Sequence, residues 1–279
     1  MRASCFSARR SRGHSTVVSD RRLATIRLAV EYDGTAFHGW QRQSRARSVQ
    51  GEIEAALQRI TGAPARVTGA GRTDAGCHAA GQVASATLET RLDASRLQAA
   101  LNAHLPRDVR IVEAVEARAE FHARFDAMRR AYRYLIVPPP SAIRRSQAWV
   151  RAMKCGAEAL HRASQPLKGE HDFIAFSKAT PDADSTRCRI TRARWSGRAG
   201  RLRFDIEADR FLYTMVRKIV ATVVREAESG DGAGSVRAVL ESRDRRAAAP
   251  PAPAHGLYLM RVRYPRIGWV PRGRMNVVG

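Results

Sequence analysis

The chain has 279 residues, of which 44% are hydrophobic and 27% are charged, and it carries a formal net charge of +23. This length has room for one large domain or two of ordinary size, and the hydrophobic fraction excludes a globally disordered chain. The basic composition predicts a polyanionic partner, with nucleic acid first and an anionic membrane surface second. The apolar run at 219–224 is far too short to span a bilayer, so no membrane insertion is expected.

Residues 1–22 contain six arginines and one acidic residue, Asp20, without apolar periodicity. This composition predicts a disordered basic leader. A transit peptide, an RNA-binding arm or a start assigned too early would look the same, whereas a secretory signal is excluded because no apolar core is present. The remaining residues keep a net charge of +18, so the basic character belongs to the folded part.

Residues 23–125 show the pattern of an α+β domain. Alternating apolar and polar residues predict strands, and apolar residues three and four apart predict helices that Ser48 and Asp93 begin. Gly62 and Pro106 are typical of the points where such helices end. The predicted elements are a strand at 25–32, a helix at 48–62, a strand at 82–88, a helix at 93–105 and a strand at 109–115.

Two loops of this half carry candidate functional residues. Residues 37–43 mix aromatic, amide and guanidinium groups, which can stack on bases and contact phosphates. The commoner fate of a single tryptophan such as Trp40 is a place at the edge of the core. Residues 69–78 contain three glycines and one carboxylate, Asp74, two residues after Arg72.

In an extended segment, Arg72 and Asp74 project to the same side, and a neighbouring guanidinium favours the charged form of a carboxylic acid. That arrangement suits a nucleophile or a general base. The alternative is a surface turn in which Asp74 caps its own backbone and Arg72 is solvated. The loop by itself does not decide between the two interpretations.

Residues 126–270 are expected to form a second α+β domain, followed by a tail at 271–279. In the strand at 129–136, Tyr132, Tyr134 and Ile136 share one face, although tyrosine also simply suits strands. Arg217 lies beside the apolar stripe of a helix, where it either reaches toward a cleft or is solvated. The other predicted elements are a helix at 155–164, an exposed segment at 177–193, a strand at 202–206, a helix at 211–225, a linker or ordered coil at 247–254 and a strand at 257–264.

The four cysteines, Cys5, Cys77, Cys155 and Cys188, are scattered and form no Cys-x-x-Cys pair. This spacing argues against a disulfide framework and favours a reducing, intracellular compartment. Histidine adjoins cysteine only at Cys77-His78, and neighbouring residues of an extended loop point apart, so no metal site is predicted. A metal-dependent nuclease is disfavoured for the same reason, since the sequence has no compact cluster of carboxylates or histidines.

The glycine-rich loop closely resembles the signature of the TruA family of pseudouridine synthases. Other motifs follow in the order found in that family, over about residues 24–265. They are Glu31-Tyr32-Asp33-Gly34, Gly39-Trp40-Gln41-Arg42-Gln43, Ser48-Val49-Gln50, Gly71-Arg72-Thr73-Asp74-Ala75-Gly76-Cys77-His78-Ala79, Leu101-Asn102, Phe121-His122-Ala123-Arg124-Phe125, Tyr132-Arg133-Tyr134, His171-Asp172-Phe173, Phe211-Leu212-Tyr213 with Met215-Val216-Arg217, and Gly256-Leu257-Tyr258-Leu259.

The resemblance implies the pseudouridine synthase fold, an α+β fold with two similar domains around a central basic cleft. Each domain would contain an antiparallel sheet flanked by helices. The resemblance also implies a cytoplasmic homodimer that binds tRNA across both subunits and needs no cofactor or metal. It further implies isomerisation of uridine to pseudouridine in the anticodon stem-loop, at positions 38, 39 and/or 40.

By the same resemblance, Asp74 is the nucleophile, which attacks either the base or the sugar. Arg72 fills the space that the flipped base leaves, Tyr132 stacks on the base, and Arg217 pairs with the catalytic carboxylate. Arg42, Arg124 and Arg210 are candidate tRNA contacts. Cys77, which replaces an aliphatic residue of the family, is expected to pack as a small hydrophobe. The alternative function is a non-catalytic RNA-binding or chaperone protein on the same fold.

Overall fold

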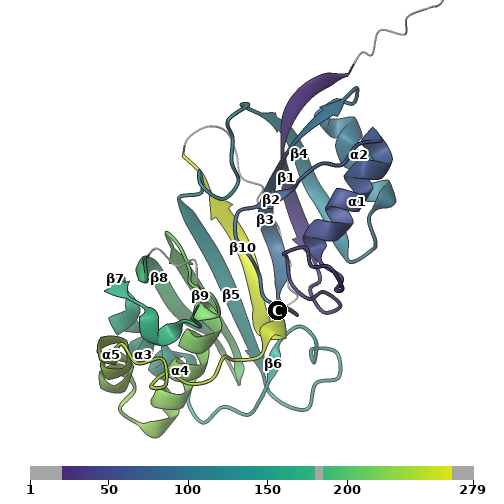
Figure 1. Ribbon diagram of the computed structural model, residues 1–279. Helices are drawn as coiled ribbons and strands as arrows, with labels where there is room; N and C mark the ends of the chain where they lie inside the picture. The colour runs from purple at the N-terminus through teal and green to yellow at the C-terminus, as the bar shows by residue number, and fades with distance from the viewer. Residues whose placement is uncertain (1–20, 180–184, 266–279) are drawn as a thin grey trace, which may run out of the picture.

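The computed structural model describes residues 21–179 and 185–265 (Figure 1). Most of the predicted leader and the tail at 271–279 lie outside the described residues. Arg22, which we assigned to the leader, belongs to the first strand, because that strand extends three residues beyond its predicted start. Within the described ranges, no helix is long and apolar enough to cross a membrane.

The described residues form one mixed sheet of ten strands, in the order β4-β1-β3-β10-β5-β9-β8-β7, with β2 paired to β3 and β6 to β5. Among the strands that the structure describes, only β10 with β3 and β5 with β6 pair in parallel. The strands are β1 (Arg22–Tyr32), β2 (Thr68–Gly69), β3 (His78–Thr90), β4 (Val109–Ala117), β5 (Arg129–Val137), β6 (Trp149–Val150), β7 (Gly169–Asp172), β8 (Arg187–Arg198), β9 (Arg201–Ala208) and β10 (Leu257–Arg263).

The helices lie at the two ends of this sheet (Figure 1). Helices α1 (Val49–Thr61) and α2 (Ala94–His104) lie beside the strands of the first half, and α3 (Ala157–Ser164), α4 (Met215–Ser229) and α5 (Gly232–Ser242) lie beside those of the second. The α+β class is therefore confirmed. The sheets that we expected in each half are joined into one, because the last strand, β10, pairs with β3 on one side and with β5 on the other.

The helix boundaries of the first half follow the predicted caps. Ser48 accepts a hydrogen bond from the Gly51 amide, and Gly62 ends α1 with a left-handed φ of 77°. Asp93 caps α2 by accepting from the Arg96 amide. In the second half, α4 begins at Met215 rather than at 211, because the residues before it form a turn that ends in a left-handed Thr214.

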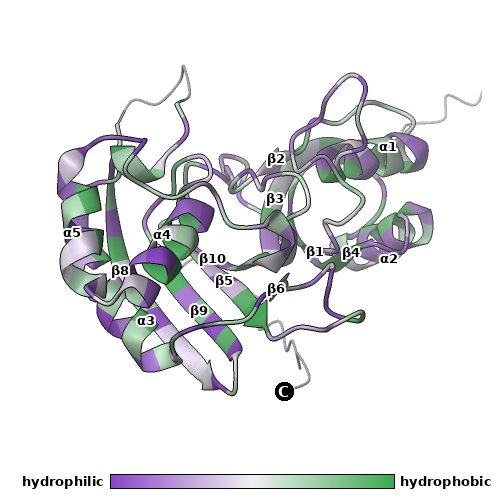
Figure 2. Cartoon of the chain, turned by 90° about the horizontal axis from the view of Figure 1, so that it is seen from below, coloured by the Kyte–Doolittle hydropathy of each residue, from purple (hydrophilic) through white to green (hydrophobic). Residues whose placement is uncertain are grey.

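Two parts of the second half differ from the prediction. Residues 187–193 belong to β8 and not to an exposed segment, since Cys188, Ile190 and Ala193 are buried while the arginines between them face solvent. Helix α5 was not predicted, because glycines interrupt its start, although Val236, Val239 and Leu240 form a buried stripe. Figure 2 shows the alternation of hydrophobic and hydrophilic residues along β9.

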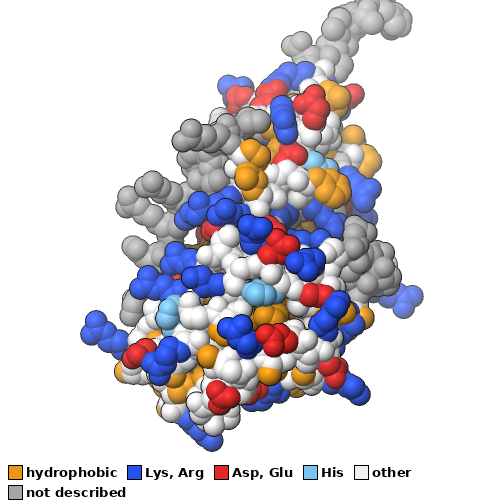
Figure 3. Space-filling view, turned by 90° about the vertical axis from the view of Figure 1, so that its left-hand side faces the viewer, with side chains coloured by type: hydrophobic (Ala, Val, Ile, Leu, Met, Phe, Trp, Pro, Cys, Tyr) orange, Lys and Arg blue, Asp and Glu red, His pale blue; other side chains and the backbone are white. Residues whose placement is uncertain are grey.

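The predicted shared face of β5 is confirmed, because Tyr132, Tyr134 and Ile136 are all buried. On the adjacent strand, β9, Phe204 and Ile206 are also buried and lie on the same face of the sheet as these tyrosines. The segment at 247–254 is an ordered coil in which Ala248, Ala249 and Ala252 are buried. Lys and Arg side chains outnumber Asp and Glu on the side of the molecule drawn in Figure 3, as the composition predicts.

Candidate active site

The loop at 70–77 is held by the loop at 37–41. The Trp40 amide donates to the Thr73 carbonyl at 3.1 Å, and the Gly76 amide donates to the Phe37 carbonyl at 3.1 Å. Gly39 has a φ of +96°, and a Cβ there would lie 2.7 Å from the Thr73 oxygen, so only glycine allows this approach. Trp40 is 2% exposed and belongs to the core, which confirms the common interpretation of this residue over base stacking.

Three further side chains hold the glycine-rich loop against the sheet. The Tyr32 hydroxyl lies 2.7 Å from the Thr73 hydroxyl, and Gln82 Nε2 donates to the Gly71 carbonyl at 2.8 Å. Arg130 Nη2 donates to the Ala70 carbonyl at 2.9 Å. Because amide, hydroxyl and guanidinium groups all bond to the loop, its backbone is fixed before any substrate arrives.

Asp74 forms an ion pair with Arg217, with Oδ2 2.7 Å from Nη1. The two side chains are only 15% and 18% exposed, so the pair is sheltered but still reachable from solvent. Arg217 is oriented in turn by the Ala252 carbonyl, which accepts from Nε at 2.7 Å. The resemblance implied this contact, and the structure contains it between residues 143 positions apart in sequence.

The Arg72 side chain does not lie beside Asp74, as an extended loop would place it. Its side chain is exposed, and Nε donates to Gln41 Oε1 at 3.0 Å. The guanidinium that pairs with Asp74 therefore comes from α4 and not from the loop itself. The reason is that Thr73, between the two residues, turns inward to Tyr32 and leaves Arg72 pointing outward.

Tyr132 lies next to the loop with its ring buried and its hydroxyl available. The ring is 8% exposed and packs edge-on against Phe211 at 5.1 Å. A Cβ added to Gly71 would lie 3.9 Å from the Tyr132 hydroxyl, which places that hydroxyl over the loop. Burial raises the pKa of the phenol. Within residues 21–179 and 185–265 the hydroxyl has no hydrogen-bond partner, so it can serve a substrate.

The three candidate tRNA contacts differ in their partners. One is paired with a carboxylate, and the other two are, or lie next to, residues that Arg130 connects to the glycine-rich loop. Arg42 is paired with Glu54 at 3.1 Å, although its side chain is 68% exposed. Arg124 and Arg210 are exposed. Arg130 connects both to the loop, because its guanidinium also donates to the carbonyls of Arg124 and Asp209, at 2.8 Å each.

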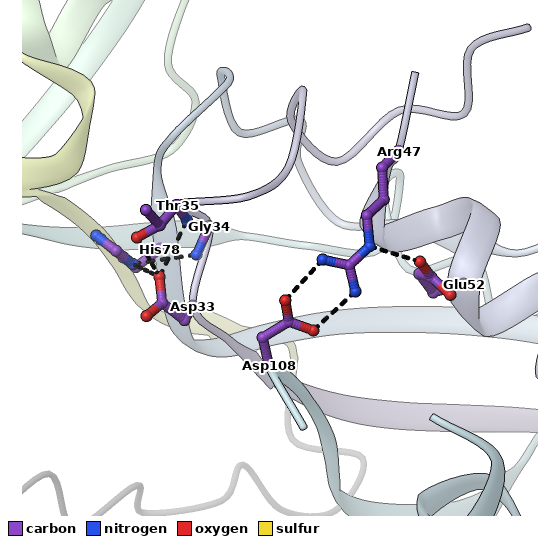
Figure 4. A network of polar contacts seen from close by, with 7 residues as sticks. All are labelled: Asp33, Gly34, Thr35, Arg47, Glu52, His78 and Asp108. Carbon is purple, nitrogen blue, oxygen red and sulfur yellow. Dashed lines mark hydrogen bonds and ion pairs between the residues drawn. The ribbon is translucent and has the colours of Figure 1, made fainter. Parts of the chain in front are cut away.

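Arg130 and Arg47 support the site, and sequence reasoning missed both. Arg47 donates to Asp108 through both Nη atoms, at 2.7 and 2.9 Å, and to Glu52 through Nε at 2.8 Å (Figure 4). Its guanidinium lies 4.1 Å from the centre of the Phe37 ring. Phe37 bonds to the glycine-rich loop, so Arg47 supports that loop from behind. No local signal identifies either role, because Asp108, the carboxylate that Arg47 binds with both Nη atoms, and Ala70, the loop residue that Arg130 binds, are each about 60 positions away.

A second group of contacts lies at the end of the same loop. His78 Nδ1 is 3.1 Å from Asp33 Oδ1 and accepts from the Gly34 amide at 3.1 Å (Figure 4). Its ring stacks on Tyr258 at 4.6 Å. Burial acts to raise the pKa of Asp33, but hydrogen bonds from Thr35 and the nearby His78 bring it below its usual value. These contacts join the loop to β10.

Cys77 packs as the sequence predicted. It is 1% exposed, and burial raises the pKa of its thiol to about 12. Such a thiol is inert. Within the described part of the chain, no three His, Cys, Asp or Glu side chains come together as metal ligands would.

Comparison with known proteins decides the family. A family model described as tRNA pseudouridine synthase matches residues 28–126 and 163–265. The chain is 44% identical to tRNA pseudouridine synthase A of Chlorobaculum tepidum, over 88% of this chain and 99% of that protein. It is 42% identical to the protein of the same name from Sinorhizobium medicae, over 87% of this chain and 100% of that one. The chain belongs to the tRNA pseudouridine synthase family.

The ion pair at the site joins the two matched segments. Asp74 lies in the first segment and Arg217 in the second, and Tyr132 lies between them in sequence. A site in this member of the tRNA pseudouridine synthase family therefore needs both halves of the chain folded together. Pairing of β10 with β3 and β5 provides that connection.

Proposed function

We propose that the protein converts uridine to pseudouridine in the anticodon stem-loop of tRNA, at positions 38, 39 and/or 40, with Asp74 as the nucleophile. The observation that carries the proposal is the ion pair of Asp74 with Arg217 in a fixed loop beside the free hydroxyl of Tyr132. The family match and the names of the relatives support the substrate and the reaction.

The reaction is redox-neutral. The bond from uracil N1 to the ribose C1′ breaks, a bond from C5 to C1′ forms, the hydrogen on C5 leaves as a proton, and N1 takes up a proton. A carboxylate that adds either to the base or to the sugar keeps the two fragments together while the base turns. Asp74 has the surroundings for this role, because Arg217 Nη1 donates to its Oδ2 at 2.7 Å and so orients the carboxylate.

Five side chains would contact the base and the RNA around it. Flipping a uridine from its stack costs a few kcal/mol, and Arg72, which is exposed and donates to Gln41, would fill the space that the base leaves. Tyr132 would stack on the flipped base and place its hydroxyl near the ring, where protons are exchanged. Arg42, Arg124 and Arg210, whose side chains are all exposed, would contact phosphates.

The assembly is part of the proposal. We infer a cytoplasmic homodimer whose tRNA crosses both subunits, with no cofactor or metal, and a basic cleft between domains at 23–125 and 126–270. The two separately matched segments support the division of the chain into these domains. The net charge of +23 supports a nucleic-acid partner.

The test is release of tritium from tRNA that carries [5-³H]uridine, measured for the wild type and for Asp74→Asn without added metal. The wild type should release tritium, and Asp74→Asn should release none while it still binds tRNA. Asp244→Asn, which removes a half-exposed carboxylate that pairs with Arg246 elsewhere on the surface, is the matched control and should behave as the wild type. Appreciable release by Asp74→Asn would disprove the nucleophile role. Tight binding without release by the wild type would favour the non-catalytic RNA-binding alternative.

A further inference from the structure

The sheet has a second basic surface, on the face opposite the candidate site. Along β5, Arg129 and Arg133 alternate with Tyr132 and Tyr134, so their side chains leave the sheet on the other side. The register places Asp205 and Glu207 of β9 on the same face. We call this surface, formed by β10, β5, β9 and the part of β8 after its bulge, the arginine face.

The arginine face carries far more positive than negative charge. Its two carboxylates each bind two arginines: Asp205 pairs with Arg133 at 2.8 Å and Arg203 at 3.0 Å. Glu207 pairs with Arg129 at 3.4 Å and Arg263 at 3.2 Å. These pairs hold four guanidinium groups in place across three strands and leave each with donors to spare.

Five more arginines on this face have no carboxylate partner among the described residues. They lie on β8, β9 and β10, and all are exposed: Arg192, Arg194, Arg198, Arg201 and Arg261. Like charges gathered on one open face repel one another, and a polyanion relieves this repulsion by binding. The planar fork of arginine also suits the oxygens of a phosphate.

We propose that the arginine face binds the phosphate backbone of RNA outside the stem-loop that enters the site. The proposal rests on the proposed function, which supplies the RNA. A membrane surface is disfavoured because none of the exposed large hydrophobic side chains of the described residues lies on these strands. A second copy of the chain is disfavoured because a two-fold interface would set arginine against arginine.

The test compares two triple variants that remove the same charge. One carries Arg194→Gln, Arg198→Gln and Arg201→Gln on the arginine face. The control carries Arg59→Gln, Arg91→Gln and Arg237→Gln, which lie on α1, after β3 and on α5 and are likewise exposed without a partner among the described residues. Both variants should keep the melting temperature of the wild type, because no described contact is lost.

Binding is measured with full-length tRNA and with an isolated anticodon stem-loop over a range of salt concentrations. The face variant should bind full-length tRNA about tenfold more weakly than the control variant, and the slope of log K against log salt should fall by about two to three units. Its affinity for the short stem-loop should equal that of the control. Binding does not require turnover, so this result is independent of whether uridine is isomerised.

Each contrary result overturns the proposal. Equal binding of full-length tRNA by the two variants would mean that the arginine face is only a solvated surface. An equal loss with the short stem-loop would place these arginines in contact with the site's own substrate. Loss of binding to anionic vesicles alone, or a change of oligomeric state in sedimentation, would assign the face to a membrane or to a second subunit.

Discussion

The two faces of the central sheet use the same amino acid in opposite ways. On the site face, Arg130 and Arg217 bond to backbone carbonyls and to Asp74, so their positions are set by the protein. On the arginine face, residues such as Arg192 and Arg194 have no partner among the described residues. The arginines behind the net charge of +23 are therefore of two kinds. Those that bond to the protein have a structural role, and those without a partner are available to a ligand.

The largest effect is expected from removing Arg217, the cation that orients Asp74. Arg217→Met should lower turnover by at least about 100-fold, because a misplaced catalytic group loses most of its advantage. Arg217→Lys keeps the charge but cannot bond to Asp74 and Ala252 with the same geometry, so it should recover only part of the activity. Single-turnover tritium release measures both. Wild-type rates in Arg217→Met would show that Asp74 does not depend on this pair.

Neighbouring arginines on the two faces give the next comparison. Arg130→Met leaves the carbonyls of Ala70, Arg124 and Asp209 without their donor and should lower the free energy of unfolding by about 3 kcal/mol. Arg261→Met removes an exposed guanidinium that has no partner among the described residues and should change it by less than about 0.5 kcal/mol. Urea denaturation measures the two values. If they are equal, the division between structural and available arginines is wrong.

The sequence predicts what is local and misses what is distant. The caps at Ser48 and Asp93 and the period of two in β5 are short-range signals, and all were read correctly. The place of β10 between β3 and β5, the bond of Arg47 to Asp108 and the bond of Arg130 to Ala70 connect residues far apart in sequence, which no periodicity predicts. Asp74 was a candidate from its loop, whereas its pairing with Arg217 was implied only by the family resemblance, because no local pattern connects residues 143 positions apart.

Tyr132 offers a test on the site face that leaves the fold intact. Tyr132→Phe keeps the ring against Phe211 and removes a hydroxyl that has no partner among the described residues, so stability should be unchanged. Turnover should fall about tenfold or more if that hydroxyl takes part in proton transfer. Thermal unfolding and single-turnover kinetics on the same sample separate the two effects. A loss of stability would mean that the hydroxyl has a structural role.

The smallest effect is expected at Arg47, a structural cation that contacts the candidate site only through Phe37. Arg47→Lys keeps a positive charge beside Asp108 and Glu52 but loses the two-pronged contact, which should lower the free energy of unfolding by about 1 kcal/mol because the side chain is 35% exposed.

Phe37 and Gly76 join Arg47 to the glycine-rich loop, so kcat should fall two- to threefold with little change in KM. The matched control, Arg45→Lys, changes an arginine of the same loop that has no partner among the described residues and should leave both constants unaltered. An increase in KM alone would mean that Arg47 contributes to RNA binding, and it would then belong with the arginines of the opposite face.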